Sequence, residues 1–158
     1  MLIQQKQGNL KNLDDLQLPV DWLDLEWFEM NKRILTRATR GGTLLNLKFL
    51  GENPQYTEGD VLFEDELSII AIHILPCEVM VIKPRNAYET AAVCYEIGNR
   101  HLPLFMDDAY LLVPFEVPLF KILSDSNYIV LKEDRQLLKQ LKTTILPHIL
   151  VKSESFSP

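Results

Sequence analysis

The segment NAYETAAVCYEIGNRHLPLFM, residues 86–106, has the pattern of a helix that ends at a corner and continues as a strand. Asn86 is a typical helix N-cap, and Glu89 follows three positions later, where its carboxylate can bond back to the cap in a capping box. Apolar and small side chains recur at helical spacing between Tyr88 and Tyr95. We predict a helix over residues 86–97 that stops at Gly98, because glycine takes the left-handed conformation at little cost.

The corner itself carries His101. Apolar residues alternate along 102–106, which predicts a strand directly after the corner. The whole chain has only 3 histidines. A histidine between a helix end and a strand is placed to present a ligand group rather than to fill a core, so His101 is the first candidate for binding chemistry.

The composition describes a soluble globular protein. The chain has 158 residues, 47% of them hydrophobic and 24% charged, which suits one ordinary domain or two small ones. A net charge of −6 argues against nucleic acid as the main partner, because phosphate binding needs a basic surface. No apolar run approaches the ~18 residues of a membrane span, so no membrane partner is expected. The polar N-terminus and the isolated Cys77 and Cys94 predict a reduced, cytoplasmic setting.

The first half of the sequence has the pattern of strands. Two short runs, 34–39 and 44–49, flank Gly41 and Gly42 and predict a hairpin. Alternation from Leu23 to Trp27, and apolar runs at 61–63 and 67–75, indicate further strands. No helix pattern longer than two turns precedes Pro84. We therefore expect a small all-β domain over residues 1–76.

In the second half of the sequence, strand patterns alternate with helix patterns. Strands are expected at 79–82, 102–106, 110–115 and 128–131, and helices at 86–97 and 118–125. This β-α-β-β-α-β order is typical of a ferredoxin-like fold, so the fold class is α+β, with this domain over residues 77–150. Leucines at helical spacing predict a further amphipathic helix over 134–146. Residues 151–158 are polar and are expected to form a flexible tail.

The run Tyr95-Glu96-Ile97-Gly98-Asn99-Arg100-His101-Leu102-Pro103-Leu104 resembles the signature of the UreE family of urease accessory proteins, the nickel metallochaperones of urease maturation. Runs at 20–23, 31–35 and 59–62 resemble the N-terminal domain of that family, in the same order. The likeness covers about residues 18–131 and implies a β domain similar to a chaperone peptide-binding domain, followed by a ferredoxin-like metal-binding domain. It also implies a homodimer that can form larger assemblies, such as a metal-linked tetramer.

The resemblance implies a carrier of Ni²⁺, with Zn²⁺ or Cu²⁺ able to substitute. The sequence has no nucleophile elbow, phosphate loop or HExxH motif, so no enzyme activity is expected. Its partners would be the complex of urease apoprotein and accessory proteins, including the GTPase of that complex. Such ions take ~four or more donors, so one imidazole is not enough and His101 of each protomer would meet at a two-fold axis. The alternative is a protein-interaction adaptor in which metal only stabilises the oligomer.

Neighbours of His101 are given supporting roles. Arg100 is always cationic and cannot bind a metal, so we expect it to anchor the loop through Glu96, Asp107 or a backbone carbonyl. Asn99 is expected to orient the imidazole, and Gly98 to end the helix. The candidate dimer contacts are the apolar residues of the following strand, Leu102, Leu104 and Phe105.

The other two histidines have different predicted roles. His148 follows Pro147 in a polar end of the chain, and it is either an auxiliary metal ligand or a solvated surface histidine. His73 lies among isoleucines, so we expect a partly buried, hydrogen-bonded side chain. Many members of the family end in a histidine-rich tail, whereas residues 153–158 hold no histidine.

Two further groups of side chains, one basic and one of cysteines, are candidates for binding. The basic residues of the predicted hairpin region are either a solvated strand face or a docking surface for an acidic partner; they are Lys32, Arg33, Arg37 and Arg40. Cys77 and Cys94 are soft donors by chemistry, but their apolar surroundings favour inert, partly buried thiols.

Overall fold

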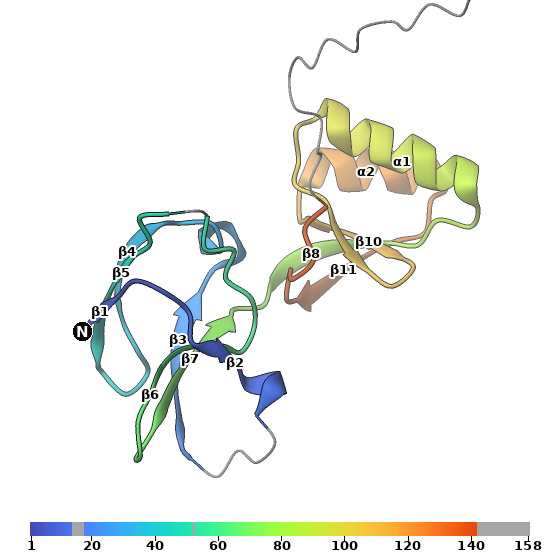
Figure 1. Cartoon of the computed structure of the whole chain (residues 1–158). Helices are drawn as coiled ribbons and strands as arrows, with labels where there is room; N and C mark the ends of the chain where they lie inside the picture. Colours follow the sequence, from blue (N-terminus) through green and yellow to red (C-terminus); the bar gives the residue numbers. More distant parts are fainter. Residues whose placement is uncertain (14–17, 52, 142–158) are drawn as a thin grey trace, which may run out of the picture.

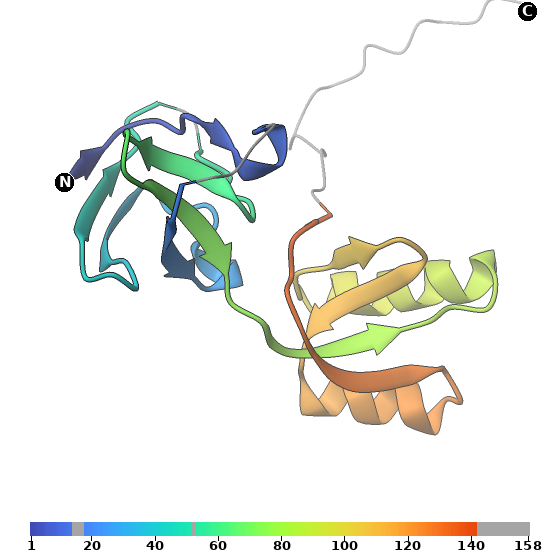
Figure 2. The same ribbon diagram turned by 90° about the horizontal axis from the view of Figure 1, so that it is seen from below.

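The computed structural model describes residues 1–13, 18–51 and 53–141. It consists of a β-rich N-terminal domain and an α+β C-terminal domain, joined where the chain passes from one strand into the next near Pro76 (Figures 1 and 2). His148, and the parts of the predicted helix and tail beyond residue 141, lie outside the described residues.

The N-terminal domain is built from two sheets. Their orders are β1-β5-β4 and β2-β6-β7-β3, with β3 parallel to β7. Leu23, Leu47 and Ile72 come from different strands and are buried in one shared core. The strands are β1 (Leu2–Ile3), β2 (Gly8–Asn9), β3 (Val20–Leu25), β4 (Ile34–Ala38), β5 (Leu44–Lys48), β6 (Asp60–Glu64) and β7 (Ile69–Ile74), with short 3-10 helices η1 (Leu10–Asn12) and η2 (Trp27–Glu29).

The predicted hairpin is confirmed, since β4 and β5 pair antiparallel around the turn. Gly42 supplies the positive φ of 90° that this turn requires, whereas Gly41 does not take it. The strand predicted to reach Trp27 was wrong at its end, because β3 stops at Leu25. The Glu29 carboxylate accepts the Glu26 backbone N–H at 3.0 Å, and this cap starts η2 in place of a longer strand.

The C-terminal domain has the predicted ferredoxin-like topology. Its sheet has the order β11-β8-β10-β9, and every neighbouring pair is antiparallel. The elements are β8 (Cys77–Ile82), α1 (Ala87–Asn99), β9 (Phe105–Asp107), β10 (Tyr110–Pro114), α2 (Val117–Asp125) and β11 (Val130–Arg135). Both helices cover the same face of this sheet (Figure 1). The strand predicted from Leu102 begins only at Phe105, and the Leu102 N–H bonds to the helix end at the Ile97 carbonyl instead of to a neighbouring strand.

Both faces of the sheet are buried, which explains the nearly continuous apolar run of β8. Met80 and Ile82 face the two helices, and Val79 and Val81 face the opposite side. On that opposite side they pack with Leu137, which follows β11, and with Trp27 of the N-terminal domain. The contact between the domains is therefore part of the core of the sheet.

The helix predicted over 134–146 was wrong in its described part. β11 continues to Arg135, and Gln140 forms an antiparallel bridge with Phe105. Leu137 packs on the sheet of the C-terminal domain, whereas Leu138 packs against the core of the N-terminal domain. Neighbouring leucines that point to opposite sides belong to extended chain, because side chains of a strand alternate between its faces.

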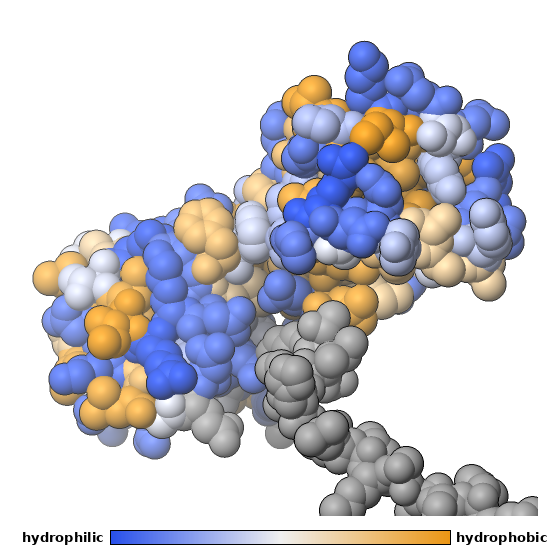
Figure 3. Space-filling model, turned by 90° about the horizontal axis from the view of Figure 1, so that it is seen from above, coloured by the Kyte–Doolittle hydropathy of each residue, from blue (hydrophilic) through white to orange (hydrophobic). Residues whose placement is uncertain are grey.

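None of the helices in the described ranges is long and apolar enough to cross a membrane. Some large hydrophobic side chains nevertheless remain on the surface. Figure 3 shows orange patches of hydrophobic residues among hydrophilic ones on one face of both domains. The most exposed of the large side chains with hydrophobic character include Ile34, Leu67, Tyr88 and Tyr95.

Candidate functional site

The candidate site is the C-terminal end of α1, where the sequence places Gly98, Asn99, Arg100 and His101. Asn86 caps the start of the helix by accepting the Glu89 backbone N–H at 3.0 Å. The predicted return bond of the capping box is not made to Asn86. Instead the Glu89 carboxylate accepts the backbone N–H and the side chain of Arg85, at 2.8 and 2.7 Å.

The helix ends two residues later than predicted. Helical conformation continues through Asn99, and the residue with a left-handed backbone is His101, at φ 56°. The His101 N–H donates to the Gly98 carbonyl at 3.0 Å, and the Leu102 N–H donates to the Ile97 carbonyl at 3.2 Å. This pair of bonds is the Schellman motif, in which His101 occupies the position that glycine usually takes.

The motif decides how His101 is presented. Leu102 packs back onto the core between α1, α2 and the sheet, which holds the backbone on the far side of the corner. His101 is exposed, and none of the hydrogen bonds or ion pairs of the described residues involves its ring. The imidazole is therefore free to accept a metal ion or a partner.

Arg100 anchors this corner as predicted. Its Nε donates to the Glu96 carboxylate at 2.9 Å, one helical turn earlier. The partner is Glu96 rather than Asp107, which instead contacts Arg135 at 3.3 Å. Asn99 is an exposed residue of the last helical turn. Gly98 likewise lies within the helix.

A pocket of about 430 Å³ opens beside His101. It is lined by Cys94, Ile97 and Gly98 of α1, by residues 101–104, and by Gln140 and Leu141 of the extended C-terminal segment. Burial raises the pKa of the Cys94 thiol, so the protonated form that ligates poorly is favoured. Cys77 lies elsewhere, at the start of β8, and burial together with Glu26 and Asp134 raises its pKa as well.

The proposed contact residues divide into two groups. Leu102 is partly buried, whereas Leu104 and Phe105 are only 8% and 1% exposed. The prediction that all three lie on an open surface was wrong for Leu104 and Phe105. Leu104 packs under the helices, and Phe105 packs on the other face of the sheet against Trp27.

The open apolar surface near the site lies on α1 instead. Tyr88 and Tyr95 are 81% and 72% exposed, and Ala91 and Gly98 share their side of the helix. The spacing that predicted a helix face was thus correct, but this face points outward. Val93 and Ile97 form the buried side.

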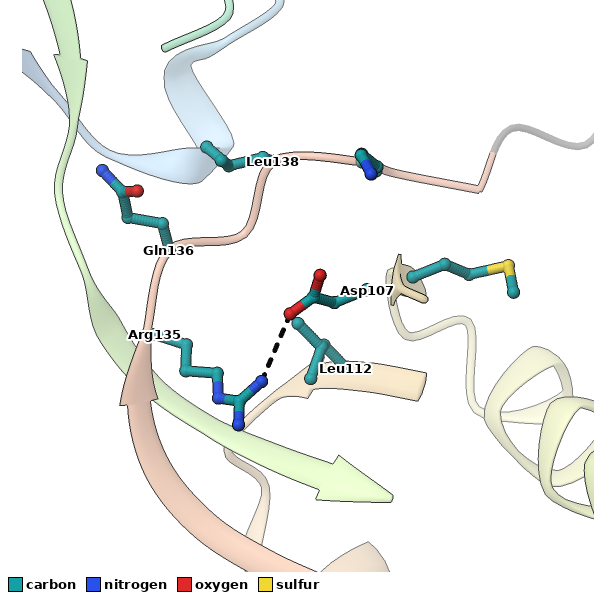
Figure 4. A pocket seen from close by; sticks show the side chains of 7 residues that line it. Asp107, Leu112, Arg135, Gln136 and Leu138 are labelled. Carbon is teal, nitrogen blue, oxygen red and sulfur yellow. Dashed lines mark hydrogen bonds and ion pairs between the residues drawn. The ribbon is translucent and has the colours of Figure 1, made fainter. Parts of the chain in front are cut away.

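A second pocket, of about 250 Å³, lies where the extended C-terminal segment leaves β11. Figure 4 shows Arg135 reaching across it toward Asp107, with Leu112, Gln136 and Leu138 along its wall. The Arg135 guanidinium is already engaged by Asp107 and Glu133. None of its lining residues in the described part of the chain carries an imidazole or a thiol.

The remaining candidates have partners within the chain. His73 contacts the Glu58 carboxylate through Nδ1 at 2.9 Å, as expected for a satisfied histidine. Among the basic residues, Lys32 and Arg37 pair with Glu29, and Arg40 pairs with Asp24. Only Arg33 of that group has no ion pair among the described residues. Within the same ranges, no three His, Cys, Asp or Glu side chains come together as a metal site.

Comparison with known proteins shows to which family this chain belongs. Residues 3–75 match the model of the UreE urease accessory protein N-terminal domain, and residues 77–142 match that of the UreE C-terminal domain. The chain belongs to the UreE family. It is 40% identical to the urease accessory protein UreE of Flavobacterium johnsoniae over 148 residues, which cover 94% of this chain and 90% of that protein.

Two other relatives cover most of the chain. UreE of Acetivibrio thermocellus is 36% identical over 123 residues, 78% of this chain and 80% of that protein. UreE of Helicobacter pylori strain G27 is 40% identical over 127 residues, 78% of this chain and 74% of that protein. Family membership places the chain among the accessory proteins of urease rather than among catalytic enzymes.

Proposed function

We propose that this chain carries Ni²⁺ for the assembly of the urease active site and binds the ion through His101. The observation that carries the proposal is the exposed imidazole at the left-handed position of the α1 cap. Imidazole nitrogen suits Ni²⁺, and also Zn²⁺ and Cu²⁺, so the identity of the ion would depend on availability. Arg100 and Glu96 support the site by fixing the last helical turn.

One chain supplies too few donors for such an ion. In the described part of the chain, no three His, Cys, Asp or Glu side chains come together around His101. We therefore propose a homodimer in which the two copies of His101 meet at the two-fold axis. The exposed face of α1, formed by Tyr88, Ala91, Tyr95 and Gly98, leads to His101 and is the surface that the second protomer would cover.

His148 lies outside the described residues and is proposed as an auxiliary ligand. Two copies from the two tails would raise the donor count from two to four. A site completed by tail residues would release its metal more readily than a site with four fixed protein ligands. Ready release is what a protein that delivers metal requires. A metal-linked tetramer is the other way to gain donors, since two dimers can share one ion through four copies of His101.

The recipient would be the complex of urease apoprotein with its other accessory proteins, including the GTPase. The alternative function is that of an adaptor in this complex, with metal only stabilising the oligomer. The two functions differ in their dependence on His101. A carrier loses urease activation when the imidazole is removed, whereas an adaptor retains it.

The test is a calorimetric titration of Ni²⁺ into the wild type, His101→Ala and the matched control His73→Gln. His73 is hydrogen-bonded to Glu58, so its replacement should leave nickel binding unchanged. We expect one ion for two chains in the wild type and loss of this binding in His101→Ala. Retention of nickel binding and of urease activation by His101→Ala would contradict the proposal. Sedimentation with and without metal would distinguish dimer from tetramer.

A further inference from the structure

The segment that follows β11 crosses the sheet of the C-terminal domain from one edge to the other. In the strand order β11-β8-β10-β9, β11 lies at one edge and β9 at the opposite edge. β11 ends at Arg135, and Gln140 already forms an antiparallel bridge with Phe105 of β9. The chain therefore passes over the width of the sheet within a few residues. We name residues 136–141 the strap.

The start of the strap is held by both domains. The Gln136 side-chain amide donates to the Ile74 carbonyl at 2.7 Å and to the Glu58 carboxylate at 3.1 Å. The same carboxylate accepts the Ile74 N–H at 2.7 Å, so these groups form a closed set of bonds on the N-terminal domain. Leu137 is buried on the sheet of the C-terminal domain, whereas Leu138 packs against the core of the N-terminal domain. Moving this end would break contacts in both cores.

The far end of the strap is held by fewer contacts. The Met106 N–H donates to the Lys139 carbonyl at 3.0 Å, and the Leu141 N–H donates to the Leu104 carbonyl at 2.8 Å. Residues 139–141 are all exposed. In the part of the chain that the structure describes, the side chains of Lys139 and Gln140 form no hydrogen bond or ion pair. Segments with exposed backbone bonds and few buried contacts can open locally while the rest of a fold stays intact.

The strap also borders open space. Figure 4 shows the pocket of about 250 Å³ beside Gln136 and Leu138. A pocket of about 170 Å³ is lined by residues 138–140 together with residues of the N-terminal domain. Residues 140–141 form part of the wall of the pocket of about 430 Å³ beside His101. With pockets on these sides, the far end of the strap can leave β9 without displacing closely packed neighbours.

We propose that the strap is a conformational device that connects the N-terminal domain to the pocket beside His101. In the closed state, which the structure shows, residues 139–141 pair with β9 and form one wall of that pocket. In the open state, this end leaves β9 and the wall is removed. Gln136 stays bound to Glu58 in both states. Because a strap fixed at its start has fewer open conformations, this anchor favours the closed state.

Opening of the strap needs no metal ion. It changes the surroundings of His101, because the chain that continues from Leu141 starts beside the imidazole in the closed state and away from it in the open state. This consequence for nickel binding rests on the proposed function, whereas the opening itself does not. Both tests below use the metal-free protein, so a failure of nickel binding at His101 would not alter their outcome.

The first test measures opening through the Cys94 thiol, which lines the pocket beside His101. Leu141→Pro removes the N–H that bonds to the Leu104 carbonyl, whereas the matched control Leu141→Ala shortens the side chain and keeps that N–H. We expect iodoacetamide to modify Cys94 about tenfold faster in Leu141→Pro than in Leu141→Ala, with the rate at Cys77 equal in both. Mass spectrometry of the digested protein measures each thiol separately. Equal rates at Cys94 would overturn the proposal, because the bonds to β9 would then not close the pocket.

The second test measures the effect of the anchor on the far end. Gln136→Ala removes the anchoring amide, and the matched control is Gln5→Ala, because Gln5 is exposed and its side chain has no hydrogen bond within the described ranges. Hydrogen exchange followed by NMR should show the Met106 and Leu141 amides exchanging about tenfold faster in Gln136→Ala, and as in the wild type in Gln5→Ala. Unchanged exchange of these two amides in Gln136→Ala would overturn the proposal. So would an equal acceleration throughout the C-terminal domain, because the whole domain, and not the strap, would then be opening.

Discussion

The Leu102 N–H donates to the Ile97 carbonyl, and this 3.2 Å bond closes the turn that places His101 in the left-handed region at φ 56°. A glycine would adopt this conformation without a clash, whereas a residue with a Cβ loses roughly 1–2 kcal/mol there. Backbone conformations of this kind concentrate at functional sites, where the surrounding structure maintains them. The fold thus keeps an unfavourable residue at the position that presents the imidazole outward.

Replacing His101 should separate stability from metal binding. We expect His101→Gly to be more stable than His101→Ala by about 0.5–1 kcal/mol, because alanine retains the Cβ clash that glycine removes. Both variants should lose nickel binding to the same extent. Urea unfolding of the metal-free proteins measures the first effect and calorimetry the second. A His101→Ala protein that is as stable as His101→Gly would show that the backbone at this corner carries no strain.

Nickel affinity should fall as the pH is lowered, because only the neutral imidazole has a lone pair for the metal. The thiols should not contribute, since burial raises the pKa of Cys94 and keeps it protonated. Cys94→Ala is the matched variant because it alters the pocket beside His101 and leaves the imidazole in place. Its titration at two pH values should follow that of the wild type. Loss of binding in Cys94→Ala, or a thiolate-to-metal absorption band, would assign the metal to sulfur.

The exposed side of α1 should govern dimer formation. Tyr95→Asp introduces a charge into a surface that a second protomer would bury, and the side chain is 72% exposed in the single chain. We therefore expect a weaker dimer, by at least tenfold in dissociation constant, with an unchanged melting temperature for the monomer. Leu67→Asp is the control at an equally exposed position far from α1. Sedimentation of both variants across a concentration series measures the effect, and an unaltered dimer in Tyr95→Asp would place the interface elsewhere.

Local signals in the sequence predicted the elements that depend on local chemistry. The β4–β5 hairpin follows from two glycines between alternating runs, and α1 follows from Asn86 and helical spacing. The end of α1 was misplaced because Gly98 is a strong stop signal by itself. The ion pair of Arg100 with Glu96 and the packing of Leu102 carry the helix and its cap further.

Structure that depends on contacts between distant segments could not be predicted from local sequence signals. Leu137 and Leu138 suit a helix as well as an extended chain, and only the two cores on either side of them decide for the extended form. Phe105 was expected at the surface because nothing in residues 102–106 reveals that Trp27 covers it. The candidate imidazole was found from the sequence, whereas the exposed α1 face beside it required the packing of the whole domain.

Acid should destabilise the N-terminal domain through Glu29, whose side chain is buried among cations. Burial raises the pKa of this carboxyl, but the Glu26 N–H, Lys32 and Arg37 outweigh it and hold the pKa below the ordinary value of 4.5. Since the pKa is lower in the folded state, its contribution to stability is full above about pH 4.5 and is lost as the pH falls through the folded pKa. Glu29→Gln should cost on the order of 2 kcal/mol at neutral pH, because Lys32 and Arg37 would each lose a charged hydrogen-bond partner, and should flatten the acid dependence of unfolding. The control is Glu64→Gln, at an exposed position, which should retain the acid dependence. Urea unfolding between pH 7 and pH 3 measures the free energy of unfolding of both variants. An equal pH dependence of this free energy in the two variants would assign the acid sensitivity to other carboxylates.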